Sequence, residues 1–143
     1  MYYCIIALLM LFSSPSEKQT MTNNQHVTVE MHYPVSMSLS VPALCTFFFT
    51  PSPGIHLNTA PIIELRLEKK SQFELVGNPT FQKNEQEYLD ISAPVEFSIH
   101  AKKGTAPGKQ PLKGTLNYFY CSDKDGWCNR FSQPIEVTVE LSK

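Results

Sequence analysis

Alternation of apolar and polar residues recurs in six separate segments of this 143-residue chain, and it constrains the fold more than any other feature. A period of two places all the apolar side chains of a segment on one face of a β-strand. The segments that share this pattern are 27–31, 37–41, 63–67, 95–99, 116–120 and 135–141. Each such strand has one apolar face to bury, so the strands must pack against one another.

Turn-forming residues separate these segments. They are Pro51-Ser52-Pro53-Gly54, Gly77-Asn78-Pro79, residues 104–108 and Asp125-Gly126. No window of helical length shows a period of 3.6 residues outside the N-terminal leader. The simplest arrangement that buries all the apolar faces is two antiparallel sheets packed face to face. The sequence therefore predicts an all-β fold, an immunoglobulin-like antiparallel β-sandwich, over residues 26–143.

The N-terminus carries an apolar run, residues 1–12, followed by small residues. The run has the size of a signal-peptide core and is too short to cross a bilayer comfortably. We interpret residues 1–16 as a signal peptide and the polar residues 17–25 as a flexible tether. The basic residue that usually precedes such a core is missing, which leaves a truncated gene start as the alternative. A signal peptide predicts a periplasmic or secreted protein, and no later segment has the character of a transmembrane span.

Composition argues against several classes of function. The formal net charge is −1 and no basic stripe is visible, so we expect no nucleic-acid partner. The four histidines are scattered, and no Cys-x-x-Cys or His-Glu-x-x-His motif occurs, so we expect neither a metal nor another cofactor. The Gly-x-Ser-x-Gly elbow of serine hydrolases is also missing.

Four cysteines are present, and only Cys121 and Cys128 lie close together in sequence. If Asp123–Gly126 forms a four-residue hairpin loop, the two cysteines face each other with Cα atoms about 4.5–5.5 Å apart. A disulfide accepts about 4.4–6.8 Å, so the pair is then bondable. If Asp125-Gly126 instead forms a two-residue turn, Cys128 faces Asp123 and the bond is harder to make. Cys45, in an apolar segment, is predicted to be a buried free thiol.

A disulfide between Cys121 and Cys128 would contribute little to the stability of the fold. Closing a ring of about eight residues removes about 2.5 kcal/mol of unfolded-chain entropy. A redox-active pair and an inert structural disulfide therefore both remain open. Phe119 and Trp127 are candidates to shield the sulfurs, and the alternative for Trp127 is simple packing of a hairpin-tip aromatic on the sheet.

The order of motifs resembles the N-terminal extracytoplasmic domain of the bacterial transmembrane thiol–disulfide reductase DsbD. The resemblance covers residues 26–142 and is most specific at the hairpin, where a Tyr-rich strand runs into Cys121 and an acidic-Gly-Trp tip runs into Cys128. It also includes a Pro-Gly turn followed by a His-bearing strand (50–58), an aromatic-containing loop (79–85) and the strand at 93–99.

The resemblance implies that Cys121 and Cys128 are a catalytic pair that exchanges with protein thiols. It also implies that Phe81 belongs to a cap loop that shields the disulfide. The expected partners are thioredoxin-like or other extracytoplasmic redox proteins, or a membrane electron-transfer domain. The expected activity is that of a thiol–disulfide oxidoreductase. The competing hypothesis is a secreted β-sandwich that serves as a binding or structural module with an inert hairpin disulfide.

Overall fold

The structure is a computed structural model, and it describes residues 15–143. The predicted signal peptide therefore lies almost wholly outside the described residues. The described part contains ten strands and no helix. The strands are β1 (Ser16–Asn24), β2 (Val27–Pro34), β3 (Ser36–Ser38), β4 (Ala43–Pro51), β5 (Ile55–Leu57), β6 (Glu64–Leu67), β7 (Phe73–Thr80), β8 (Val95–Ala101), β9 (Gly108–Ser122) and β10 (Cys128–Ser142).

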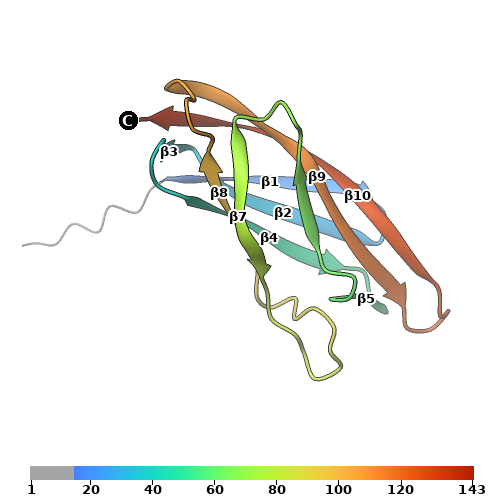
Figure 1. Cartoon of the computed structure of the whole chain (residues 1–143). Coiled ribbons are helices and arrows are strands. Elements are labelled where there is room, and N and C mark those ends of the chain that lie inside the picture. Colours follow the sequence, from blue (N-terminus) through green and yellow to red (C-terminus); the bar gives the residue numbers. More distant parts are fainter. Residues whose placement is uncertain (1–14) are drawn as a thin grey trace, which may run out of the picture.

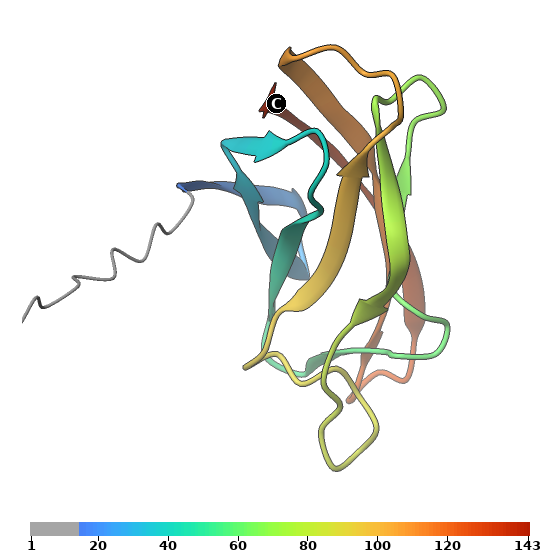
Figure 2. The same cartoon turned by 60° about the vertical axis from the view of Figure 1, so that its left-hand side comes forward.

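These strands form two sheets that pack face to face (Figures 1 and 2). One sheet has the order β1-β2-β4-β8-β7, and the other has the order β3-β10-β9-β5, with β6 also paired to β9. All pairings are antiparallel except that of β3 with β10. The prediction of an all-β sandwich is confirmed. Its immunoglobulin-like character remains a prediction.

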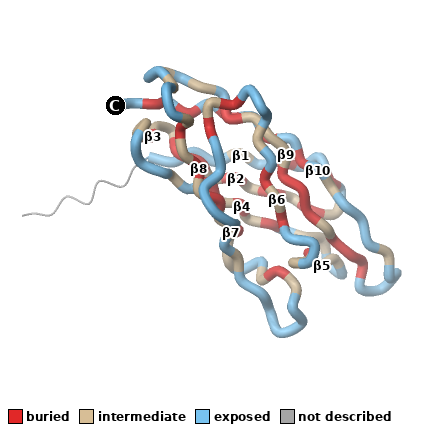
Figure 3. The backbone as a smooth tube through the Cα atoms, viewed as in Figure 1, coloured by how far each residue is buried: buried red, intermediate tan, exposed pale blue. Residues whose placement is uncertain are grey.

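The core lies between the sheets and is built by the period-two pattern (Figure 3). In β2 the buried residues Val27, Val29 and Met31 alternate with partly exposed ones. In β10 every second residue from Gln133 to Leu141 is buried. Strands with one buried face gain their stability chiefly from removing apolar area from water, at about 25 cal/mol per Å². The two sheets therefore depend on each other for their stability.

A long hairpin, β9–β10, dominates the second sheet. Its register runs without a break from the pair Gly108–Leu141 to the pair Cys121–Cys128. At the far end, β5 pairs with the last residues of β9, so that His56 lies opposite Cys121. The hairpin tip is thus the outer end of a three-stranded strip made of β5, β9 and β10.

The prediction of a flexible tether at residues 17–25 is wrong, because residues 16–24 form the edge strand β1 and the sandwich begins at Ser16. Only Met21 and Asn24 of β1 are buried, and Met21 is the one apolar residue of the two. The segment therefore shows no alternation of apolar and polar residues. Its backbone pairs with β2 from Ser16–Pro34 onward. An edge strand that is exposed to water is held mainly by backbone hydrogen bonds to its neighbour and needs no apolar face. Because β1 is polar, nothing in its sequence indicated a strand.

Gly77-Asn78-Pro79, predicted as a turn between strands, instead lies inside the edge strand β7. The register of β7 with β8 shifts between Val76 and Thr80, and Gly77 has a φ of 70°. A bulge in an edge strand accommodates both a glycine with positive φ and a proline that donates no hydrogen bond. Glycine, asparagine and proline therefore occur together both in turns between strands and in bulges within an edge strand.

Candidate redox site at the hairpin tip

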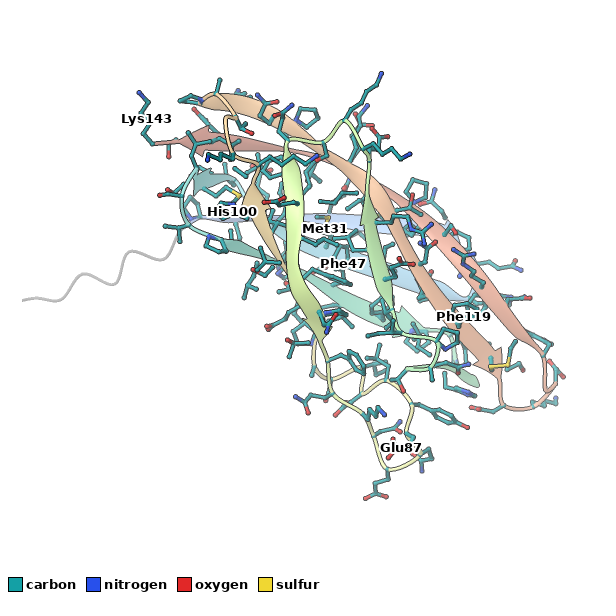
Figure 4. The ribbon with its side chains drawn as sticks, viewed as in Figure 1. Met31, Phe47, Glu87, His100, Phe119 and Lys143 are labelled. Carbon is teal, nitrogen blue, oxygen red and sulfur yellow. A yellow bond between two sulfur atoms is a disulfide. The ribbon has the colours of Figure 1, made fainter. Side chains whose placement is uncertain are left out.

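Cys121 and Cys128 form a disulfide at the tip of the β9–β10 hairpin, drawn as a yellow bond in Figure 4. The two residues are directly opposed in the register, with Cα atoms 4.0 Å apart. Ser122 N–H donates to the Trp127 carbonyl oxygen at 2.9 Å, so the cysteines occupy the neighbouring, non-hydrogen-bonded position, where opposed residues lie closest. The four-residue loop is therefore the correct alternative of the two turns considered.

Local hydrogen bonds explain the shape of this turn. Gly126 N–H donates to the Ser122 carbonyl oxygen at 3.0 Å, and Asp125 N–H donates to Ser122 Oγ at 3.1 Å. Gly126 has a φ of 72°, a conformation that glycine adopts without a steric penalty. Serine and glycine thus close the loop at its two ends, and Asp123–Gly126 need no contact with the core.

The tip is also fixed to the Pro-Gly turn and to β5. Asp123 N–H donates to the Gly54 carbonyl oxygen at 2.9 Å, and the Asp123 carboxylate is hydrogen-bonded to His56 Nδ1. Opposed residues on neighbouring strands point to the same face of a sheet. His56, Cys121 and Cys128 therefore form one row on the outer face of the second sheet.

The two sulfur-bearing residues differ in their exposure. Cys121 is only 6% exposed, whereas Cys128 is exposed to solvent. Cys121 lies in the middle of the row, with β5 on one side and β10 on the other, while Cys128 lies on the strand whose other edge faces water at the tip. Cys128 is therefore the more accessible residue of the pair.

Asn58, which follows β5, contacts the Cys121 sulfur. Asn58 Nδ2 lies 3.3 Å from Cys121 Sγ and donates a hydrogen bond to it. The Asn58 backbone N–H donates to the Phe119 carbonyl oxygen at 2.9 Å, which continues the β5–β9 pairing by one step. Asn58 therefore lies on the same outer face as the cysteine row. The sequence analysis did not single out Asn58, since a lone asparagine after a short strand resembles any loop residue.

The loop between β7 and β8, residues 81–94, lies beside β5. Leu89 N–H donates to the Leu57 carbonyl oxygen at 3.0 Å, and Tyr88 stacks on His56 with ring centroids 3.6 Å apart and planes 13° apart. Figure 4 shows this loop, with Glu87 at its far end, on the same side of the molecule as the disulfide. Tyr88 is therefore the aromatic side chain that brings this loop into contact with the cysteine row.

Phe81, the residue that the resemblance assigned to a cap loop, is partly buried and packs against the hydrophobic core. Phe119 is partly exposed and is opposed to Arg130, one step along the hairpin from the cysteines on the same face. The shielding roles of Phe81 and Phe119 remain predictions.

Trp127 packs on aromatic rings of the sandwich. Its ring centroid lies 5.9 Å from that of Tyr120 at an interplanar angle of 88°, and 5.1 Å from that of His26. Tyr120 belongs to the core, on the face of β9 opposite to that of Cys121. These contacts match the packing alternative for Trp127, and a shielding role for its ring stays a prediction.

Cys45 is fully buried in β4, as predicted, and it is a free thiol. Burial raises the pKa of this thiol to about 12, because a thiolate loses its hydration inside the core. Cys45 is thus unsuited to thiol–disulfide exchange.

Within residues 15–143, no group of three or more His, Cys, Asp or Glu side chains is arranged to hold a metal ion. Nor does any helix there have the length and apolar character needed to span a membrane. Comparison of the chain with protein-family models, with curated proteins and with solved structures returned no match.

Proposed function

We propose that this protein is an extracytoplasmic thiol–disulfide exchange module that passes electrons to or from protein partners through Cys121 and Cys128. The observation that carries the proposal is the asymmetric exposure of the disulfide, with one buried and one exposed cysteine at the tip of the β9–β10 hairpin. Exposed disulfides are the ones open to exchange. The resemblance of the hairpin and the motif order to the DsbD N-terminal domain supports the same function, as an analogy.

The small size of the disulfide ring also favours exchange. The cysteines are seven residues apart in sequence, and in the loop-entropy model a ring of that size contributes about 2.5 kcal/mol to folding. By linkage, the same free energy separates the reduction potential of the pair in the folded protein from that in the unfolded chain. Since about 30 mV corresponds to about 1.4 kcal/mol, folding lowers the potential by about 54 mV. The fold therefore does little to lock the bond.

The reaction follows from the exposure. A partner thiolate attacks Cys128 Sγ, the Cys128–partner bond forms, and the electron pair of the old bond leaves with Cys121 as a thiolate. A second thiolate of the partner then attacks the partner's own sulfur and releases Cys128. The pair has gained two electrons and the partner has become a disulfide. The reverse sequence oxidises the dithiol, and the suitable partners are thioredoxin-like proteins or a membrane electron-transfer domain, in the periplasm or outside the cell.

Equilibration of the protein with glutathione buffers of graded ratio tests this proposal. Exchange requires a reduction potential above about −300 mV, whereas a lower value identifies a structural disulfide and refutes exchange. Trapping gives an independent test. In a Cys4→Ser chain, Cys121→Ser leaves the exposed Cys128, which is first converted with Ellman's reagent to its mixed disulfide with thionitrobenzoate. The thiolate of a thioredoxin that carries a single active-site cysteine should attack Cys128 Sγ, form a protein–protein mixed disulfide and release thionitrobenzoate, while Cys128→Ser leaves the buried Cys121 and serves as the matched control.

The second candidate is a binding or structural sandwich with an inert disulfide. It is favoured by the anchoring of the turn to Gly54 and His56, which shows that the tip is also a structural junction. The potential measurement separates the two candidates.

A further inference from the structure

The carboxamide of Asn58 offers both a donor and an acceptor to the Cys121 sulfur. Nδ2 lies 3.3 Å from Sγ, and Oδ1 lies 3.6 Å from the same atom. A disulfide sulfur carries no proton, so in the oxidised protein Nδ2 alone makes a hydrogen bond. After reduction, a thiolate accepts from Nδ2–H and a thiol donates to Oδ1. The amide therefore suits both protonation states of reduced Cys121.

The backbone around Asn58 is fixed before any reaction begins. Asn58 N–H is bonded to the Phe119 carbonyl oxygen at 2.9 Å. The residues on either side of Asn58 form hydrogen bonds with the loop between β7 and β8. The Leu57 carbonyl oxygen accepts from Leu89 N–H at 3.0 Å. Thr59 Oγ1 donates to the Glu87 carbonyl oxygen at 2.8 Å. A donor held in place beforehand stabilises developing charge without a cost of reorganisation.

We propose that Asn58 is a positioning residue for exchange, which binds the Cys121 sulfur once its bond to Cys128 has opened. The inference rests on the proposed function and extends it. As the partner thiolate attacks Cys128 Sγ, the electron pair of the breaking bond localises on Cys121 Sγ, next to Asn58 Nδ2–H, and no proton moves in this step. A stabilised leaving thiolate departs faster, so Asn58 favours attack at Cys128 over attack at Cys121.

The surroundings of Cys121 make this contact important. The residue is 6% exposed, and burial of a thiolate raises the pKa of its thiol. The titratable groups that these contacts place around Cys121 are His56 on β5, Asp123 in the turn and Arg130 on β10, with Tyr88 stacked on His56 and an exposed Lys83–Glu87 pair in the same loop as Tyr88. None of these groups changes in a variant at position 58. A change in the titration of Cys121 in such a variant therefore reports on the amide itself.

The test is a titration of Cys121 in the full chain with Cys4→Ser and Cys128→Ser, in which Cys45 stays protonated below pH 10. The rate of alkylation by iodoacetamide against pH gives the pKa of the Cys121 thiol. Asn58→Ala removes the donor that stabilises the thiolate, so it should raise this pKa by about one unit, a tenfold loss of thiolate below the pKa. Asn58→Asp keeps the shape but replaces the donor by a negative charge, and should raise the pKa further.

Asn129→Ala, an exposed amide next to Cys128 on β10, is the matched control and should leave the titration unchanged. Equal pKa values in the parent, Asn58→Ala and Asn58→Asp would overturn the inference, whatever the exchange activity. Asn58→Leu has nearly the same volume and neither a donor nor an acceptor, so its titration decides the test if Asn58→Ala fails to fold. A shifted titration in a protein whose disulfide fails the glutathione test described above would instead retain the Asn58 contact and refute the exchange function.

Discussion

Asn24 on β1 donates a hydrogen bond of 3.2 Å from its side chain to the hydroxyl of Tyr118 on β9, and so joins the two sheets across the core. Asn24 is 6% exposed and Tyr118 is fully buried. Asn24 Oδ1 also accepts from the His26 N–H, at 2.9 Å, so the amide is used at both ends. This pair connects the β1–β2 turn to the strand that carries Cys121.

Tyr118→Phe should lower the free energy of unfolding by about 1–3 kcal/mol, because it leaves a buried amide donor of Asn24 without its partner. Urea unfolding followed by fluorescence measures the change. Tyr33→Phe is the control, since the Tyr33 hydroxyl donates to Glu17 near the surface and its loss should cost less. Equal effects of the two substitutions would contradict the role given to the Asn24–Tyr118 pair.

The raised pKa of Tyr118 should make the folded protein less stable at alkaline pH. Burial raises the pKa of Tyr118 from 10.0 to about 12, an effect that the Asn24 hydrogen bond partly offsets. The contribution of a group with a raised pKa is complete below the unfolded pKa and is lost as pH rises toward the folded one. Stability should therefore fall from pH 10 to pH 12, where the unfolded chain releases a proton that the folded protein retains.

Thermal midpoints measured from pH 9 to pH 12 test this expectation. The decline should be shallower in Tyr118→Phe than in the parent protein. Burial also raises the pKa of Tyr33 and of the Cys45 thiol, so part of the decline should persist in the variant. Parallel curves for the two proteins would show that Tyr118 does not titrate with a raised pKa.

Strands with a clear alternation of apolar and polar residues were predictable from the sequence, and the mostly exposed edge strands β1 and β7 were not. Val95, Phe97 and Ile99 alternate cleanly and form β8, with all three buried. In β4, three consecutive phenylalanines hide an alternation in which Phe47 is buried and Phe48 is only partly so. Periodicity reports burial of side chains, whereas β1 and β7 depend on the backbone ladder.

The candidate site divides in a similar way. The pairing of Cys121 with Cys128 was predictable because their spacing and the turn residues define a local geometry. The contacts of Asn58 and Tyr88 with this site were not, because they join segments distant in sequence. Only the pairing of β5 with β9 and the position of the loop between β7 and β8 bring these residues to the hairpin tip.

Gly126→Ala should destabilise the oxidised protein by about 1 kcal/mol, because alanine is strained at the φ of 72° that this turn requires. Gly126→Asn is the matched variant and should cost less, since asparagine tolerates the left-handed region. Unfolding free energies of the two variants in urea give the comparison. If alanine costs no more than asparagine, the turn does not depend on this conformation.

Replacement of both hairpin cysteines by serine should lower the free energy of unfolding by about 2.5 kcal/mol, the limit expected from closure of the small ring alone. The unbroken pairing of β9 with β10 and the anchoring of Asp123 to Gly54 remain in this variant. Urea unfolding of the variant and of the oxidised parent measures the contribution of the bond. A loss well above this limit would indicate a structural disulfide and weaken the case for exchange.

Cys45 should resist alkylation in the folded protein. Its side chain is fully buried and the pKa of its thiol is raised from 9.0 to about 12, so the thiolate fraction near neutral pH is about a thousandfold below that of an ordinary cysteine. In a Cys4→Ser chain with the disulfide intact, iodoacetamide should label Cys45 only when the sandwich opens. The labelling rate should therefore rise with urea in step with global unfolding.

Leu44→Cys in a Cys45→Ala chain is the control, because position 44 is 52% exposed and should react at the rate of a free thiol without urea. Rapid labelling of Cys45 without urea would show that β4 opens independently of the rest of the sandwich.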